Sequence, residues 1–145
     1  MQDIHLARIL LGGIVAGLVI IVGEYVLNAV LLAEHWAELR HDFGISQPGT
    51  AQYASGSILT LSYGVVLIWL YAAMRPRFRS DTKAAVVAAF TFWFIAYVLF
   101  LLSVWANGFV TFGIAIVSIV WGLFEAPLAA LIGARVYGLG SGFTK

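Results

Sequence analysis

Cysteine is absent from the 145-residue chain, which excludes disulfides, thiolate metal sites, cysteine nucleophiles and thiol redox chemistry. Charge is scarce as well, because 10% of the residues are charged and 62% are hydrophobic, with a mean hydropathy of +0.98. A soluble domain is charged at about a quarter of its positions, so an ordinary soluble domain and a disordered tail are both excluded. The net charge of +1 and the few basic residues exclude a nucleic-acid binder. The composition therefore indicates an integral membrane protein.

Four apolar runs are each long enough to cross a bilayer core, which takes about 20 residues of helix. They cover residues 9–33, 56–74, 84–106 and 111–137. The runs are continuous and lack the alternation of β-barrel strands. Backbone polar groups in lipid must also be bonded within their own segment. The predicted fold is therefore all-α, a single transmembrane domain over residues 1–145 built as a bundle of four transmembrane helices.

Lys and Arg are distributed unevenly between the two sides that four crossings would create. The connection between the second and third runs carries Arg75, Arg77, Arg79 and Lys83, and the same side receives Arg8, Arg135 and Lys145. Of the eight basic residues, Arg40 alone falls on the other side. Because cytoplasmic loops are enriched in Lys and Arg, both termini are predicted to be cytoplasmic. The basic connection sets this topology and can also bind anionic lipid headgroups.

The connection 34–55 is the longest loop and begins with a segment of helical spacing. Trp36, Leu39 and Phe43 fall on one face and Gly44 follows as a stop signal, which predicts a short helix lying at the outer membrane interface. Glu34, Glu38 and His41 share another face of this segment in a spacing that resembles half of a di-iron carboxylate motif. The second half of that motif is missing, so we predict a solvated helix face and no metal site.

Glu24 and Glu125 lie inside apolar runs, where a carboxyl group is costly unless it is paired, neutralised or hydrated. Each lies in a stripe of small residues at helical spacing, and such stripes let helices approach closely. The stripe residues include Gly13 and Gly17 in the first run and Ser118, Gly122, Ala129 and Gly133 in the fourth. We predict that these are helix-packing faces that join the first and fourth helices, and that both glutamates face protein.

The polar residues near the two glutamates predict an intramembrane proton or ion site. Its candidate members are Glu24, Asn28, Glu125 and Tyr97. No Lys or Arg lies deep in an apolar run, so one or both carboxyls are expected to be protonated. Glu125 can bond to Glu24, to Tyr63 or to Tyr97, and these alternatives stay open. Pro127 cannot donate to the carbonyl of Leu123 and is expected to kink the fourth helix beside Glu125. A tolerated kink with no functional role is the competing interpretation.

The positions of the aromatic residues and histidines indicate which cofactors the chain is expected to bind. The third run carries an aromatic stripe of Trp93, Tyr97 and Phe100, which leaves contact with a quinone or pigment open but is typical of bundle packing. His5, His35 and His41 all lie at or beyond the ends of the runs. A haem held between facing helices is therefore not expected, and no cofactor is predicted.

Three segments together resemble a known group of proteins: GEYVLNAVLL, WLYAAMRPRF and WGLFEAPLAAL. They are similar to segments of an uncharacterised bacterial family of small proteins with four transmembrane helices. The resemblance implies this topology and a location in the bacterial cytoplasmic (inner) membrane, and it carries over no function.

No nucleophile elbow, phosphate-binding loop, dinucleotide fingerprint or zinc-protease helix is present, so the sequence does not predict an enzyme. The leading interpretation is an accessory membrane subunit whose small-residue faces pack against other transmembrane helices, in a larger complex or a homodimer. The alternative is a small homo-oligomeric proton-coupled transporter or channel that uses Glu24 and Glu125.

Overall fold

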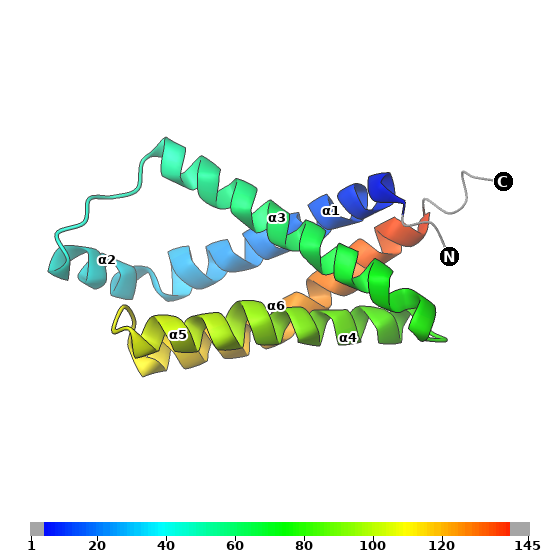
Figure 1. Cartoon of the computed structure of the whole chain (residues 1–145). Coiled ribbons are helices and arrows are strands. Elements are labelled where there is room, and N and C mark those ends of the chain that lie inside the picture. Colours follow the sequence, from blue (N-terminus) through cyan, green and yellow to red (C-terminus); the bar gives the residue numbers. More distant parts are fainter. Residues whose placement is uncertain (1–4, 140–145) are drawn as a thin grey trace.

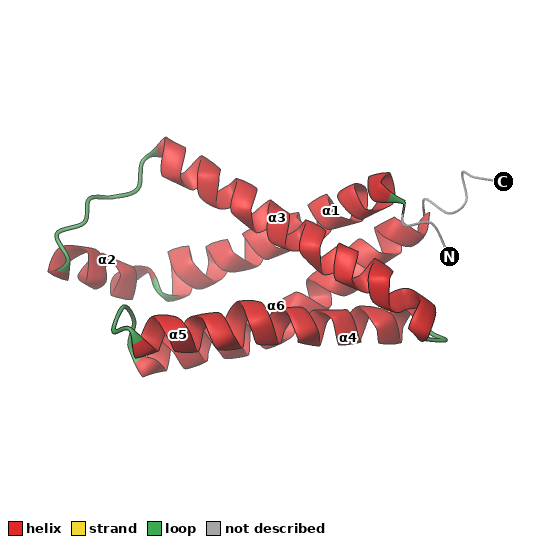
Figure 2. Ribbon diagram, viewed as in Figure 1, coloured by secondary structure: helices red, strands yellow, loops and turns green. Residues whose placement is uncertain are grey.

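The computed structural model describes residues 5–139, and in that range the chain is all-α (Figures 1 and 2). The elements in chain order are α1 (Leu6–Tyr25), the π-helix η1 (Val26–Leu31), α2 (Ala33–Asp42), α3 (Thr50–Met74), the 3₁₀-helix η2 (Arg75–Arg77), α4 (Asp81–Trp93), the π-helix η3 (Phe94–Leu99), α5 (Phe100–Ala106) and α6 (Phe112–Leu139).

Residues 5–139 contain four helices that are long and apolar enough to cross a membrane. They are Leu6–Leu31, Thr50–Arg77, Asp81–Ala106 and Phe112–Gly138, so the chain is a multi-pass membrane protein in contact with the lipid bilayer. The second span begins at Thr50, well before the apolar run near Gly56, because Gln52 and the backbone of Gly49 cap a polar first turn (3.1 Å).

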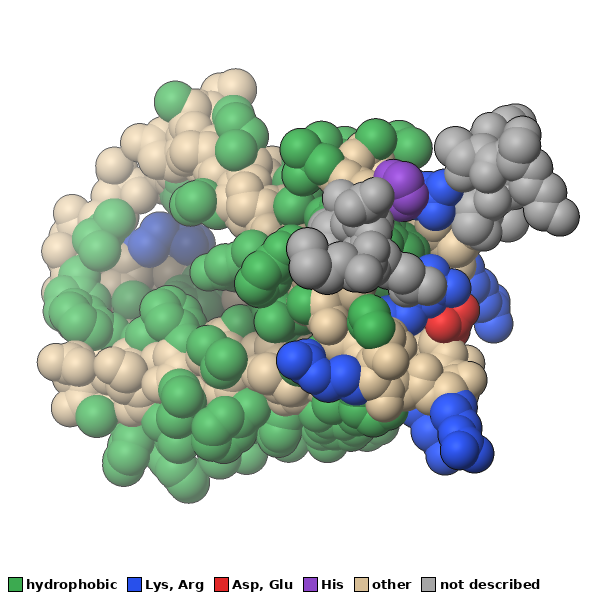
Figure 3. Space-filling model, turned by 45° about the vertical axis from the view of Figure 1, so that its right-hand side comes forward, with side chains coloured by type: hydrophobic (Ala, Val, Ile, Leu, Met, Phe, Trp, Pro, Cys, Tyr) green, Lys and Arg blue, Asp and Glu red, His purple; other side chains and the backbone are tan. Residues whose placement is uncertain are grey.

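Most of the Lys and Arg side chains seen in Figure 3 gather at one end of the bundle. The N-terminal end of α1, the α3–α4 connection and the C-terminal end of α6 lie together there. We call this the basic end, and its described residues are Arg8, Arg75, Arg77, Arg79, Lys83 and Arg135. Lys145, which the sequence places on the same side, lies outside the described residues. The opposite end carries α2, which Gly44 follows at a φ of 62°.

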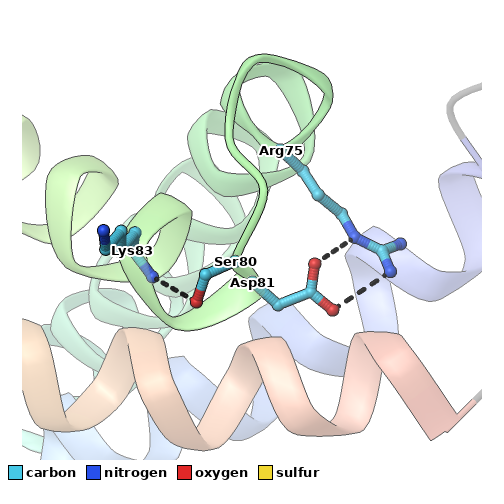
Figure 4. A network of polar contacts seen from close by, with 4 residues as sticks. All are labelled: Arg75, Ser80, Asp81 and Lys83. Carbon is cyan, nitrogen blue, oxygen red and sulfur yellow. Dashed lines mark hydrogen bonds and ion pairs between the residues drawn. The ribbon is translucent and has the colours of Figure 1, made fainter.

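The α3–α4 connection is held by side-chain bonds at the basic end (Figure 4). Arg75 binds Asp81 through two nitrogen–oxygen contacts of 2.8 and 3.1 Å, and its guanidinium lies 5.9 Å from the centre of the Tyr137 ring. Ser80 caps α4 by accepting from the backbone of Lys83 (3.4 Å). These bonds connect the end of α3 to α4 and α6.

Glycines set the crossing of α1 and α3. A Cβ atom at Gly13 would lie 2.6 Å from the Cα of Val65, and one at Gly17 would lie 2.8 Å from the Cα of Leu61. Gly64 of α3 faces the backbone of both glycines even more closely. The first small-residue stripe thus joins α1 to α3, whereas we expected it to join the first and fourth spans. The two backbones touch because no side chain separates them.

The contact between α1 and α6 is made one residue away from that stripe. A Cβ atom at Gly12 would lie 2.7 Å from the carbonyl oxygen of Gly133, and the reverse distance from Gly133 is also 2.7 Å. Ala129 is fully buried and Ser118 is 7% exposed on the same helix. Gly133 of the predicted stripe therefore packs on α1, whereas Gly122 of the same stripe faces the ring of Tyr97 on the third span.

Beyond the crossing, α3 diverges from the other spans toward the α2 end (Figure 1). Every residue from Thr50 to Leu59 is exposed. The hydroxyls of Ser57, Thr60 and Ser62 donate to carbonyls one turn back on the same helix, at 2.9–3.0 Å. This half of α3 satisfies its own polar groups and leaves its faces without a partner among the described residues.

Candidate functional site

Two turns of π-helix interrupt the spans, each six residues long. The first, η1, carries Asn28 and the second, η3, carries Tyr97. A π-turn widens the helix and re-aims its side chains, and such turns are frequent at functional sites. Both residues belong to the site described below. The hydrophobic pattern of the sequence gives no signal for either π-turn.

The Tyr97 hydroxyl lies between the two intramembrane carboxyl groups. It donates to Oε2 of Glu125 on α6 and lies 3.3 Å from Oε1 of Glu24 on α1. Tyr97 and Glu125 are 7% and 5% exposed. One phenol therefore joins three spans at a buried point.

Three further side chains extend this arrangement at both ends. Asn28 donates to Oε2 of Glu24 at 2.6 Å and accepts from the indole of Trp36 on α2 at 3.0 Å. Trp121 donates to Oε1 of Glu125 at 3.4 Å. We call the six residues Trp36, Asn28, Glu24, Tyr97, Glu125 and Trp121 the carboxyl network. It connects the short helix α2 to the middle of α6.

Counting protons in the carboxyl network constrains its charge. A tyrosine hydroxyl has one hydrogen to donate, whereas an ionised carboxylate can accept only. If Tyr97 bonds to both Glu24 and Glu125, one carboxyl must carry a proton and donate it to the phenol oxygen. Neither carboxyl contacts Lys or Arg in the hydrogen bonds of residues 5–139. The hydrogen bonds therefore require at least one proton on the two carboxyls, and its titration is a property of the pair and not of one residue.

Glycines make the space in which the carboxyl network sits. A Cβ atom at Gly23 would collide with Oε1 of Glu125, and a Cβ atom at Gly122 would collide with the ring of Tyr97. The sequence shows a glycine near each glutamate, Gly23 before Glu24 and Gly122 before Glu125, but it does not show that Gly23 contacts Glu125 or that Gly122 contacts Tyr97. Each glycine makes room for a network residue that comes from another span.

A cavity of about 390 Å³ opens beside the network on the side where α3 diverges. Its polar lining includes Glu24, Asn28, Thr60 and Tyr97, and its aromatic lining includes Trp36, Tyr63 and Phe100. Buried Ser118 also lines it. Carboxyl, amide and phenol groups thus meet an aromatic surface in one hollow, which is a typical composition for a small-ligand site.

The chain matches no protein-family model, no curated protein and no solved structure. The resemblance noted in the sequence thus identifies no family. The four long apolar helices suggest a small four-span membrane protein.

The candidate metal ligands of α2 lie apart from the carboxyl network. Glu34, Glu38 and His41 are exposed, and His41 faces Asp42 at 3.6 Å. No group of three or more potential ligands comes together in the part of the chain that the structure describes.

Pro127 lies within α6, which continues unbroken from Phe112 to Leu139. In the aromatic stripe, Trp93 donates to the carbonyl of Ile119 at 2.8 Å, so this indole ties α4 to α6.

Proposed function

We propose that the chain is a small proton-coupled transporter that exchanges a proton for an organic cation at the carboxyl network. The observation that carries this proposal is the single Tyr97 hydroxyl between Glu24 and Glu125. Intramembrane carboxyls that are not neutralised by a basic side chain typically mark proton or ion pathways. A carboxyl that can hold either a proton or a cation, but not both, couples the two movements.

The composition of the 390 Å³ cavity supports a cationic ligand. Glu24 supplies negative charge, and the rings of Trp36, Tyr63 and Phe100 supply faces that attract cations. An aromatic organic cation satisfies both features.

The accessory-subunit function is a second proposal and rests on a different observation. The exposed half of α3, Thr50–Leu59, has no partner in residues 5–139. A lipid-facing segment with this many hydroxyl groups suits contact with the transmembrane helices of other proteins in a larger complex. The native mass in mild detergent separates the two proposals. A large co-purifying complex supports the subunit, and an assembly of this chain alone supports the transporter.

The charge distribution supports a topology in which both termini are cytoplasmic and α2 lies at the outer interface. We expect an impermeant thiol reagent added outside to label Ser46→Cys and not Thr82→Cys. Both positions are exposed, and the native chain has no cysteine to interfere. Labelling of Thr82→Cys in intact cells would overturn this orientation.

The transport proposal is tested in proteoliposomes that enclose the pH dye pyranine. We expect addition of ethidium, an aromatic organic cation of fixed charge, to drive counter-movement of protons that scales with the amount of protein. Glu24→Gln should abolish the proton signal and leave the fold intact, because Gln keeps the size and hydrogen-bonding capacity of Glu. Equal proton movement in wild type, Glu24→Gln and empty liposomes would refute the proposal.

A further inference from the structure

A second hollow lies on the outer surface of the bundle, between α1 and α6, with a volume of about 720 Å³. Four of its lining side chains are strongly exposed: Leu18 (51%), Val22 (64%), Phe124 (71%) and Leu128 (54%). Because α1 and α6 cross the membrane, this groove faces lipid. Its lining is apolar apart from two residues of the carboxyl network, Trp121 and Glu125.

The two oxygens of Glu125 face different environments. Oε2 accepts from Tyr97 in the interior, whereas Oε1 lies against Gly23 and accepts from Trp121 at 3.4 Å. A bond of that length is weak, so Oε1 keeps capacity for another partner. Gly23 and Trp121 both line the groove. Glu125 is therefore the point at which the lipid-facing groove meets the carboxyl network.

From this geometry we propose that the groove binds a single-chain amphiphile with a positively charged nitrogen head, arriving from the bilayer. The apolar walls suit an alkyl chain, Glu125 supplies the opposite charge, and the rings of Trp121 and Phe124 suit a cationic head. A neutral or anionic lipid fits the apolar walls but brings no positive charge to the carboxyl group of Glu125. This inference rests on the proposed cation–proton exchange and adds a second class of organic cation, which reaches Glu125 from the lipid.

Binding is expected to release the shared proton. Tyr97 donates to Glu125, so the proton that its oxygen accepts sits on Glu24. A cation bound at the Glu125 carboxylate adds a positive charge to the pair, and the O–H bond of Glu24 then breaks. Glu24 lines the 390 Å³ cavity, so the proton can leave there. The net charge at the pair is the same before and after, because one positive charge, the cation, replaces another, the proton.

The test uses wild-type protein in lipid nanodiscs, dodecyltrimethylammonium as the probe and dodecanol as the uncharged chain. We expect saturable binding of one dodecyltrimethylammonium per chain with proton release, and no saturable binding of dodecanol. Val22→Trp fills the groove and should weaken binding about tenfold or more, as should Glu125→Gln. Val66→Trp, on a lipid-facing part of α3 outside both hollows, is the matched control and should bind as wild type.

If Val22→Trp lowers the melting temperature relative to Val66→Trp, Leu128→Trp gives a second test from α6. If a groove variant folds and still binds dodecyltrimethylammonium with wild-type affinity, the ligand does not bind in the groove. If dodecyltrimethylammonium enters nanodiscs with the protein and empty nanodiscs to the same extent, the protein does not bind it and the groove proposal is also wrong. If ethidium exchange depends on Tyr97 but the groove variants bind dodecyltrimethylammonium as wild type does, the groove proposal is wrong and the proposed function stands. Saturable groove binding without any proton release defeats the proposed function.

Discussion

Tyr97→Phe is expected to lower proton-coupled ethidium exchange about 100-fold while the chain still folds. The substitution removes one oxygen atom, and that atom is the link between Glu24 and Glu125 in the described residues. A positioned proton-transfer group contributes roughly 10²- to 10⁴-fold to the rate of its step. The stability loss should be small, about 1–2 kcal/mol, because interhelical hydrogen bonds in membranes are individually weak.

Tyr63→Phe is the matched control for that result. Tyr63 lines the same 390 Å³ cavity, packs edge-on against Phe92 at 5.9 Å, and its hydroxyl makes no hydrogen bond within residues 5–139. Its phenylalanine variant keeps the ring that faces the cavity and loses only the hydroxyl, so it should exchange protons and ethidium as wild type does. Equal rates for Tyr97→Phe and Tyr63→Phe, measured in proteoliposomes at equal protein content, would remove Tyr97 from the mechanism.

Gly64→Leu is expected to prevent the native bundle from forming, or to destabilise it by about 3 kcal/mol or more. A side chain at this position would meet the backbone of Gly13 and Gly17 on α1, which cannot move as a side-chain end can. The loss should appear as a lower melting temperature and as aggregation during size-exclusion chromatography in detergent.

Gly56→Leu tests whether this effect comes from the crossing and not from losing any glycine of α3. A Cβ atom at Gly56 meets nothing within 4 Å. This variant should melt at or near the wild-type temperature. A destabilisation of the same size at both positions would mean that the α1–α3 crossing is not what Gly64 maintains.

The sequence predicts the fold class because hydrophobicity sets it directly. Runs of about 20 apolar residues have few structural solutions in a bilayer, so the four spans and the short helix α2 follow from length and pattern. Which spans pack together is less predictable. The stripe of Gly13 and Gly17 shows that a helix approaches closely, but not that the partner is α3.

The site is predictable in its members and not in its geometry. Glu24, Asn28, Tyr97 and Glu125 stand out as polar residues in apolar runs. Their connection depends on two π-turns, η1 and η3, which have no signature in hydrophobic periodicity. Trp36 and Trp121 look like ordinary interfacial or packing aromatics in the sequence, and only their indole hydrogen bonds place them in the network.

Replacing each glutamate by Gln and by Leu separates a transport role from a packing role. In a packing subunit, Gln should substitute with little loss, and Leu should cost about 1–2 kcal/mol by leaving partners unsatisfied. In the proposed transporter, Glu125→Gln and Glu24→Gln should both melt like wild type and yet lose exchange. Full exchange by both Gln variants would exclude carboxyl-coupled transport.

The most direct test of the central claim counts the protons on Glu24 and Glu125. Infrared difference spectroscopy distinguishes the C=O stretch of a protonated carboxylic acid from that of a carboxylate, and the two Gln variants assign the signal. We predict one protonated carboxyl shared by the pair at neutral pH, with a band that either Gln variant removes or shifts and that Tyr97→Phe shifts. Absence of a protonated-carboxyl band, or a band that none of the three substitutions changes, would contradict the shared proton.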